Sequence, residues 1–79
     1  KLEYIPTELI TDKLAQGRPE CRTRTLIGNG EWVCGTLVYV DNRNNTSHVL
    51  DDSGHVIRST VADCQITTEE YTRIKQART

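Results

Sequence analysis

The sequence predicts a small α+β domain, mainly β, with five short strands between a helix at each end. Short runs of apolar and β-branched residues follow one another between residues 31 and 66, separated by turn-forming residues. Gly and Asn stand where tight turns require a positive φ. The two flanking segments carry helix-capping signals instead. With 79 residues, the chain is expected to form one domain, residues 1–79, with a small core.

The first predicted helix spans residues 7–16. Thr7 is expected to cap it, and Gly17 is expected to end it in the left-handed conformation. Its few apolar residues form a narrow stripe that could lie across a sheet or against a second copy of the chain. A homo-oligomer is therefore one of the states that the sequence allows.

The first two predicted strands, residues 21–27 and 31–41, are joined by the sequence Gly-Asn-Gly, which is typical of a hairpin. Arg22 and Arg24 alternate with threonines, so one face of the first strand should be charged and exposed. The second strand is apolar on both faces. Gly35 inside it predicts a bulge or a sharp bend, which would let the strand serve two halves of one core.

The other three predicted strands are short and span residues 47–51, 55–60 and 64–66. Turns are expected at residues 52–54 and 61–63, between one strand and the next. The five strands together would form a small β-barrel.

The last predicted helix spans residues 67–77, directly after the barrel, which would occupy residues 21–66. Thr67 is expected to cap this helix, and Glu70, three residues on, would complete a capping box. The two helices would therefore lie at the two ends of the strand region.

Composition excludes several classes of protein. Ten Lys and Arg residues against 11 Asp and Glu residues give a net charge of −1, which argues against a dedicated nucleic-acid clamp. No apolar run approaches the length needed to span a bilayer, so no membrane association is predicted. Three cysteines, an odd number, favour a reducing compartment, and we expect an intracellular location in the cytoplasm or nucleus. The chain starts with Lys and has no Met, so we expect a piece of a longer protein.

Nothing in the sequence predicts catalysis. The three cysteines and two histidines lack the short paired spacings of a zinc site. No strand-to-helix elbow or oxyanion loop accompanies a nucleophile. We therefore expect no enzyme activity, no metal and no cofactor.

Three local patterns resemble Tudor-type domains, which have an SH3-like barrel fold. They are WVCGTLVYV at residues 32–40, HVLDDSG at residues 48–54 and VADCQI at residues 61–66. The resemblance covers residues 22–66. It implies a five-stranded SH3-like barrel that holds a methylated lysine or arginine in an aromatic cage with an acidic rim.

Carried over by this resemblance, Trp32 and Tyr39 would form the walls of the cage, with Asp51 and Asp52 at its rim. On a regular strand, however, Trp32 and Tyr39 point to opposite faces. Only a bulge at Gly35 would bring the two rings together.

The predicted function is a non-catalytic interaction module that docks a protein or peptide partner, with a cationic segment as its ligand. The binding surface would be the loops at residues 28–32, 39–45 and 51–55, clustered around the barrel. The first alternative is an accessory or regulatory domain that binds nucleic acid. The arginines that would serve it are Arg22, Arg24, Arg43 and Arg58. The second alternative is a purely structural or assembly domain.

Overall fold

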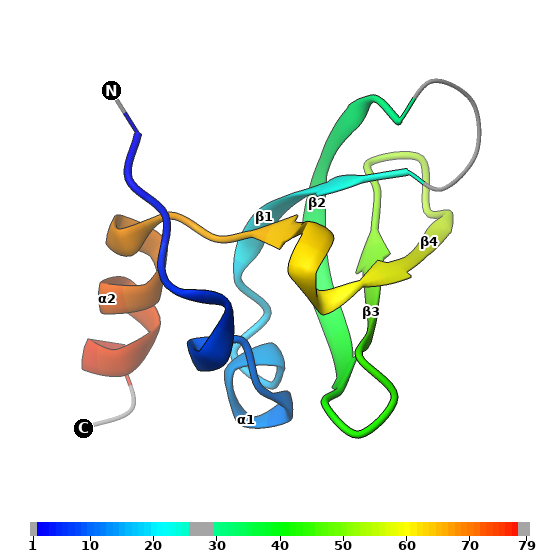
Figure 1. Ribbon diagram of the computed structural model, residues 1–79. Helices are drawn as coiled ribbons and strands as arrows, with labels where there is room; N and C mark the ends of the chain where they lie inside the picture. The colour runs from blue at the N-terminus through cyan, green and yellow to red at the C-terminus, as the bar shows by residue number, and fades with distance from the viewer. Residues whose placement is uncertain (1, 26–29, 78–79) are drawn as a thin grey trace.

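The computed structural model describes residues 2–25 and 30–77 and has the predicted α+β, mainly β, composition (Figure 1). Five antiparallel strands form one sheet in the order β4-β3-β2-β1-β5. The strands are β1 (Glu20–Arg24), β2 (Trp32–Asp41), β3 (Thr46–Leu50), β4 (Val56–Thr60) and β5 (Cys64–Gln65). The helical segments are the 3-10 turns η1 (Thr7–Leu9) and η2 (Val61–Asp63) and the α-helices α1 (Asp12–Ala15) and α2 (Thr68–Ala77).

The observed strand boundaries lie within one or two residues of the predicted ones wherever the chain is described. The end of the first predicted strand, residues 26 and 27, lies outside the described residues. So do residues 28 and 29 of the predicted hairpin turn. The predicted tight turn at residues 61–63 is the 3-10 turn η2.

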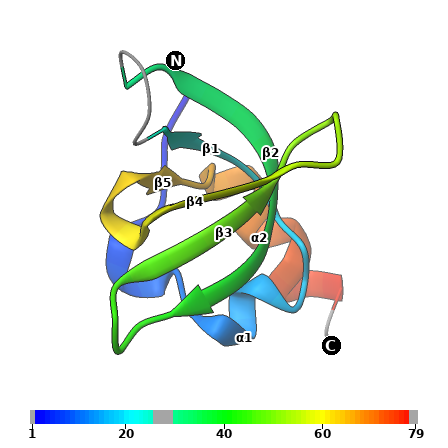
Figure 2. The ribbon, with the colours of Figure 1, turned by 90° about the vertical axis from the view of Figure 1, so that its right-hand side faces the viewer.

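The long strand β2 is shared between two parts of the sheet. Its residues 32–36 pair with β1, and its residues 36–41 pair with β3. Figure 2 shows β2 arching around the other strands. Gly35 permits the close approach of the end of β3 at the middle of β2, because a Cβ there would lie 2.5 Å from the carbonyl oxygen of Leu50. The bulge predicted at Gly35 is absent, because Gly35 pairs in regular register with Cys21 and the irregularity of β2 lies between Leu37 and Tyr39. The glycine is instead explained by the close approach of β3.

The sheet is rolled but open. Its two edge strands, β4 and β5, are not paired with each other in the described part of the chain, so a closed barrel is not confirmed. Buried hydroxyl groups link the rolled strands instead. The hydroxyl of Thr23 on β1 lies 2.5 Å from that of Ser59 on β4, and Ser59 lies 3.2 Å from Ser47 on β3. These polar groups are buried, and their hydrogen bonds to one another offset the cost of that burial.

The hydrophobic core lies between the sheet and the helical segments. It draws on the N-terminal segment, on both helices and on four of the five strands. Its most buried members are Ile10, Leu37, Val49, Ile66 and Cys64. No helix of the described residues is long and apolar enough to cross a membrane.

The helix predicted over residues 7–16 is wrong, because the chain forms η1 and α1 with an extended residue, Ile10, between them. Ile10 is buried in the core, and its carbonyl accepts a hydrogen bond of 3.0 Å from the side-chain amide of Asn42. Thr11, rather than the predicted Thr7, caps α1 with its side-chain oxygen. Core packing and a long-range hydrogen bond thus outweigh a continuous helix at this point.

The end of α1 also differs from the prediction. The left-handed residue is Arg18, with φ 51°, and not Gly17. Gly17 instead allows α2 to pack closely, since a Cβ there would lie 2.6 Å from Cγ2 of Ile74. The glycine is required by packing rather than by its own backbone conformation.

The Thr67 half of the predicted capping box forms at the start of α2, because the side-chain oxygen of Thr67 accepts a hydrogen bond of 3.1 Å from the N–H of Glu70. The Glu70 carboxylate instead accepts hydrogen bonds from the N–H of Glu20 and from Arg73. The N-terminal segment runs beside the connection from β5 to α2. The N–H of Ile5 donates to the carbonyl of Ile66 at 2.9 Å, and Tyr4 forms a β-bridge with Thr67. This pairing places the N-terminal segment beside the start of α2.

Candidate functional site

A groove of about 640 Å³ lies where three parts of the chain meet. Its floor is formed by β1 and β2, and its walls by the N-terminal segment and the first turns of α2. Asp52, from the turn between β3 and β4, also reaches it. The volume is within the range of ordinary ligand sites.

The floor of the groove follows from the alternation of side chains along β1 and β2. Cys21 and Thr23 of β1 are buried, so Arg22 and Arg24 point to the outer face, as the sequence predicts. Arg22 lies opposite Cys34 in the register of the two strands, and Cys34 is exposed. The outer face of the β1–β2 pair is therefore the floor of the groove.

Arg22 is held firmly by its neighbours. Its guanidinium carbon lies 4.5 Å from the centre of the Trp32 ring and 4.6 Å from that of the Tyr4 ring. Its Nε donates a hydrogen bond of 2.6 Å to the side-chain oxygen of Gln65. The guanidinium of Arg24 lies 4.8 Å from the centre of the same Trp32 ring. Trp32 thus receives two cations from its own chain.

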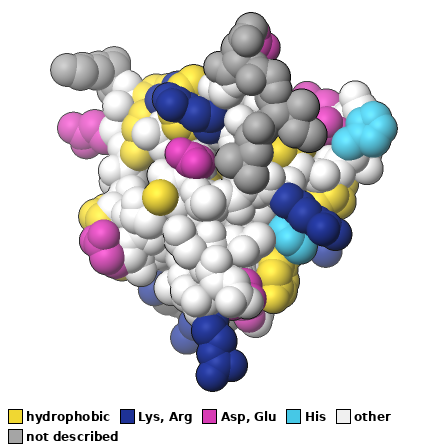
Figure 3. Space-filling model, turned by 45° about the vertical axis from the view of Figure 1, so that its right-hand side comes forward, with side chains coloured by type: hydrophobic (Ala, Val, Ile, Leu, Met, Phe, Trp, Pro, Cys, Tyr) yellow, Lys and Arg dark blue, Asp and Glu magenta, His cyan; other side chains and the backbone are white. Residues whose placement is uncertain are grey.

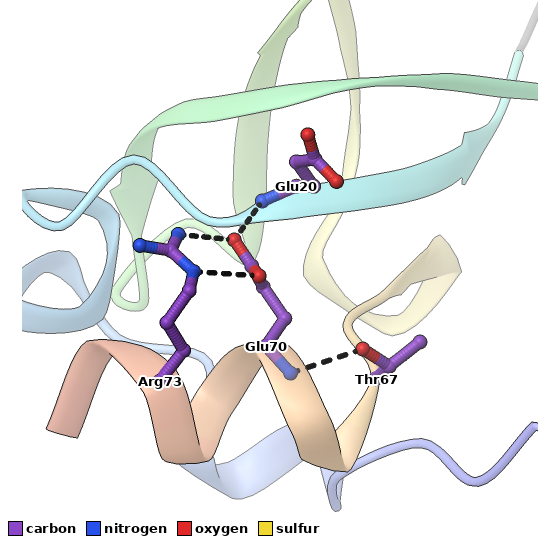
Figure 4. A network of polar contacts seen from close by, with 4 residues as sticks. All are labelled: Glu20, Thr67, Glu70 and Arg73. Carbon is purple, nitrogen blue, oxygen red and sulfur yellow. Dashed lines mark hydrogen bonds and ion pairs between the residues drawn. The ribbon is translucent and has the colours of Figure 1, made fainter. Parts of the chain in front are cut away.

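Glu70 connects α2 to the sheet (Figure 4). Its carboxylate accepts hydrogen bonds from Nε and Nη2 of Arg73 and from the backbone N–H of Glu20, the last at 2.9 Å. The bond to Arg73, followed by that from Glu20, holds the pKa of Glu70 below its ordinary value, against the opposing effect of burial. This network fixes one wall of the groove against its floor.

The groove carries an excess of negative charge. Four acidic side chains line it against two arginines, which leaves a formal charge of −2. Both arginines are engaged, Arg22 by Gln65 and the rings and Arg73 by Glu70. The other three acids are exposed and form no ion pair within 4.0 Å among the residues described; they are Glu20, Asp52 and Glu69.

The two predicted cage walls lie apart. Trp32 contacts the guanidinium groups on β1, whereas Tyr39 packs on His48 of β3, with 4.9 Å between the ring centres. Neither ring lines the groove. The register is irregular between Leu37 and Tyr39, not at Gly35, and the shift turns Tyr39 outward. The structure does not bring the two rings together.

The two predicted rim residues have different roles. Oδ1 of Asp51 accepts hydrogen bonds of 2.9 Å from the N–H groups of Ser53 and His55, so this carboxylate stabilises the turn between β3 and β4. Asp52 lines the groove and makes no such bond in the described chain. Of the predicted binding residues, only Asp52 lies at the groove itself.

The predicted arginine surface is divided. Arg22 and Arg24 lie at Trp32, while Arg58 lies on β4 opposite His48 of β3. Arg43 is exposed in the turn between β2 and β3. The three predicted binding loops are divided as well, because residues 39–45 lie at the opposite end of β2 from Trp32 (Figure 1).

The three thiols are free, and two of them are buried. A hydrogen bond between Cys21 and Cys64, together with burial, raises the pKa of Cys21 well above its ordinary range. Across residues 2–25 and 30–77, no group of three or more His, Cys, Asp or Glu side chains could hold a metal ion. Cys21 and Cys64 therefore form a pair of thiols in the interior of the domain.

Several groove residues were not predicted from the sequence, above all Tyr4, Glu20, Glu69 and Arg73. The acidic pair at residues 69 and 70 was visible, but it is typical of any first helical turn. Only the folded chain brings these residues to one place.

Comparisons of the chain with protein-family models, with curated proteins and with solved structures find no match.

Proposed function

We propose that this domain is a non-catalytic interaction module that docks a cationic peptide segment of a protein partner in the groove between β1, β2, the N-terminal segment and α2. The observation that carries this proposal is the surplus of carboxylates there, since both arginines of the groove are already engaged. A Lys or Arg side chain of a partner would supply the missing positive charge.

The fold supports this type of role. The strand order, the bent β2 and the 3-10 turn before β5 are the features expected of an SH3-like barrel, here opened at its edge strands. We infer a relation to SH3-like and Tudor-type domains from these features. The aromatic cage is not part of the proposal, because Arg22 of the chain itself contacts both Trp32 and Tyr4.

The proposed contacts combine charge with shape. Asp52 and Glu69 would pair with cationic side chains of the ligand, because both are exposed on the groove wall. The ligand backbone would lie over Cys34, Gly35 and Thr36, where the small side chains leave room. Exposed ion pairs are individually weak, so we expect modest affinity and faster association at low salt.

The test is an NMR titration of the ¹⁵N-labelled domain with a flexible Gly-Ser peptide that contains several arginines. We expect shifts of the Cys34, Gly35 and Thr36 amides, and weaker binding in the Asp52→Asn plus Glu69→Gln variant. A peptide with glutamates in place of the arginines is expected to cause no such shifts.

Glu8→Gln is the matched control, because Glu8 is an exposed carboxylate on η1, away from the groove. It should bind the arginine peptide as the wild type does. Equal responses to the two peptides, or equal weakening by Glu8→Gln, would show that the groove is not the site.

A further inference from the structure

A second aromatic cluster lies on the outer face of β2, β3 and β4, separate from the groove. Tyr39 contacts His48 through its ring, with an interplanar angle of 41°, and His48 lies opposite Arg58 in the register of β3 and β4. We refer to Tyr39, His48 and Arg58 as the Tyr39 patch. Figure 3 shows a histidine between a basic and a hydrophobic side chain on the face it displays.

The exposure of Tyr39 results from the irregular register of β2. With regular alternation, Leu37 and Tyr39 would share one face. Instead, Leu37 is completely buried, while Tyr39 is 43% exposed. Burial of the Tyr39 ring would have removed more apolar surface from water than its exposed position does. Packing of the core therefore does not explain why the ring points outward.

The charge of the patch is positive, in contrast to that of the groove. Arg58 is exposed and forms no ion pair within 4.0 Å in the part of the chain that is described. The nearest acid on the same strand as Tyr39 is Asp41, and its carboxylate accepts hydrogen bonds from the backbone N–H groups of Arg43 and Asn44 and from the side-chain amide of Asn44 in the following turn. The Asp41 carboxylate therefore faces its own loop. This leaves the Arg58 guanidinium able to pair with an anionic group of a ligand.

An exposed ring and an exposed guanidinium on opposite sides of His48 fit a ligand that is both flat and anionic and that spans the three strands. Single-stranded nucleic acid has both properties, since its bases stack on aromatic side chains and its phosphates pair with arginine. An acidic peptide would use Arg58 but would gain little from Tyr39. The geometry points to the Tyr39 patch as a binding site for single-stranded nucleic acid, with a base on Tyr39 and a phosphate on Arg58.

Of the arginines expected from the sequence to bind nucleic acid, the proposed site uses Arg58. Arg22 and Arg24 share Trp32, and Arg22 is also bonded to Gln65, so that cluster is already satisfied within the chain. Arg58 lies across His48 from the exposed Tyr39 ring, which has no cation on it among the described residues. Because the patch and the groove differ in charge and in position, one can bind its ligand when the other does not.

The experiment is an NMR titration of the ¹⁵N-labelled domain with a short oligothymidylate at low salt. We expect shifts centred on Tyr39, His48 and Arg58. Tyr39→Leu should weaken binding roughly fivefold or more, because it removes the stacking surface. Tyr39→Phe should retain binding, because the ring remains. With one phosphate contact from Arg58, a tenfold increase in salt should weaken binding about fivefold, and Arg58→Gln should reduce this dependence.

Trp32→Leu and Arg24→Gln are the matched controls, because they change the other aromatic–arginine cluster in the same way. They should leave oligothymidylate binding unchanged. Inorganic polyphosphate, which has no bases, should bind more weakly than the oligonucleotide.

Three results would overturn the inference. The first is that the oligonucleotide causes no chemical-shift changes at low salt. The second is that the changes map to Trp32 and vanish in the Trp32→Leu and Arg24→Gln variants. The third is that polyphosphate binds as tightly as the oligonucleotide. The wild-type titration and the polyphosphate comparison decide the matter even if Tyr39→Leu fails to fold.

Discussion

The two halves of β2 each display one large aromatic side chain, but the neighbours of the two rings differ. Trp32, in the half that pairs with β1, is 38% exposed, and Tyr39, in the half that pairs with β3, is 43% exposed. Two guanidinium groups lie on Trp32, whereas Tyr39 contacts the ring of His48. Exposure alone therefore does not tell whether an aromatic ring is available to a ligand. What matters is whether the chain already supplies its partner.

The largest effect is expected at the junction of the two halves. In Gly35→Ala, the new Cβ would lie 2.5 Å from the Leu50 carbonyl oxygen and 2.7 Å from Cγ1 of Val49. We expect a loss of about 3 kcal/mol in the free energy of unfolding, because backbone must move to make room. Urea denaturation followed by circular dichroism measures this loss.

Gly54→Ala is the control for this substitution. Gly54 has φ 88° but no atom within 4 Å of its added Cβ, so only backbone strain opposes the change. We expect a loss of about 1 kcal/mol. If both variants lost the same stability, the close approach of β3 would not be the reason that position 35 requires a glycine.

The wall of the groove gives the next largest effect. Glu70→Gln should lower the free energy of unfolding at neutral pH by about 1–2 kcal/mol, because the charged acceptor of the Glu20 N–H is lost. The pKa of Glu70 is lowered on folding, so its stabilisation is complete above the ordinary glutamate pKa of about 4.3. It is then lost as the pH falls further through the folded pKa.

Urea midpoints measured from neutral to acidic pH test this linkage. The difference between wild type and Glu70→Gln should shrink as the pH falls. Glu69→Gln is the control, because Glu69 is exposed and has no such hydrogen bonds among the described residues. A pH-independent difference would contradict the assigned role of the Glu70 carboxylate.

Arg22→Met tests the difference between the two aromatic rings directly. The loss of the cation from Trp32 and Tyr4 should reduce stability by about 1 kcal/mol. Trp32 is the single tryptophan, so its quenching by acrylamide should increase as the ring is uncovered. Arg24→Met should reduce stability less than Arg22→Met does, because Arg24 contacts one ring and Arg22 contacts two. Equal losses of stability in both variants would remove the special role of Arg22.

The smallest effect on stability is expected from thiol modification. In the folded domain, the exposed Cys34 should react with a disulfide reagent, while Cys21 and Cys64 should react only after denaturation. Modified Cys34 should block arginine peptides at the groove and leave oligothymidylate binding at the Tyr39 patch intact. Loss of both activities would mean that the two surfaces are not independent.

Much of the local structure could be predicted because it depends on nearby residues. The alternation that exposes Arg22 and Arg24 involves one strand, and the cap by Thr67 spans three residues. The helix at residues 7–16 could not be predicted correctly, since Ile10 is drawn out of it by the core and by Asn42. The outward turn of Tyr39 depends on a register shift that no local pattern indicates.

The sequence by itself determined the order of the strands along the chain and the charged face of β1, because these features depend on periodicity and on short-range sterics. The need for a glycine at position 35 comes from the tertiary approach of Leu50 and Val49. Only the tertiary structure decided which charged groups have a partner within the chain. Arg22 and Gln65 are 43 residues apart in the chain, and Glu20 and Glu70 are 50 apart. Since a charge is available to a partner only when folding leaves it without one, the placement of these distant groups determines the two proposed binding surfaces.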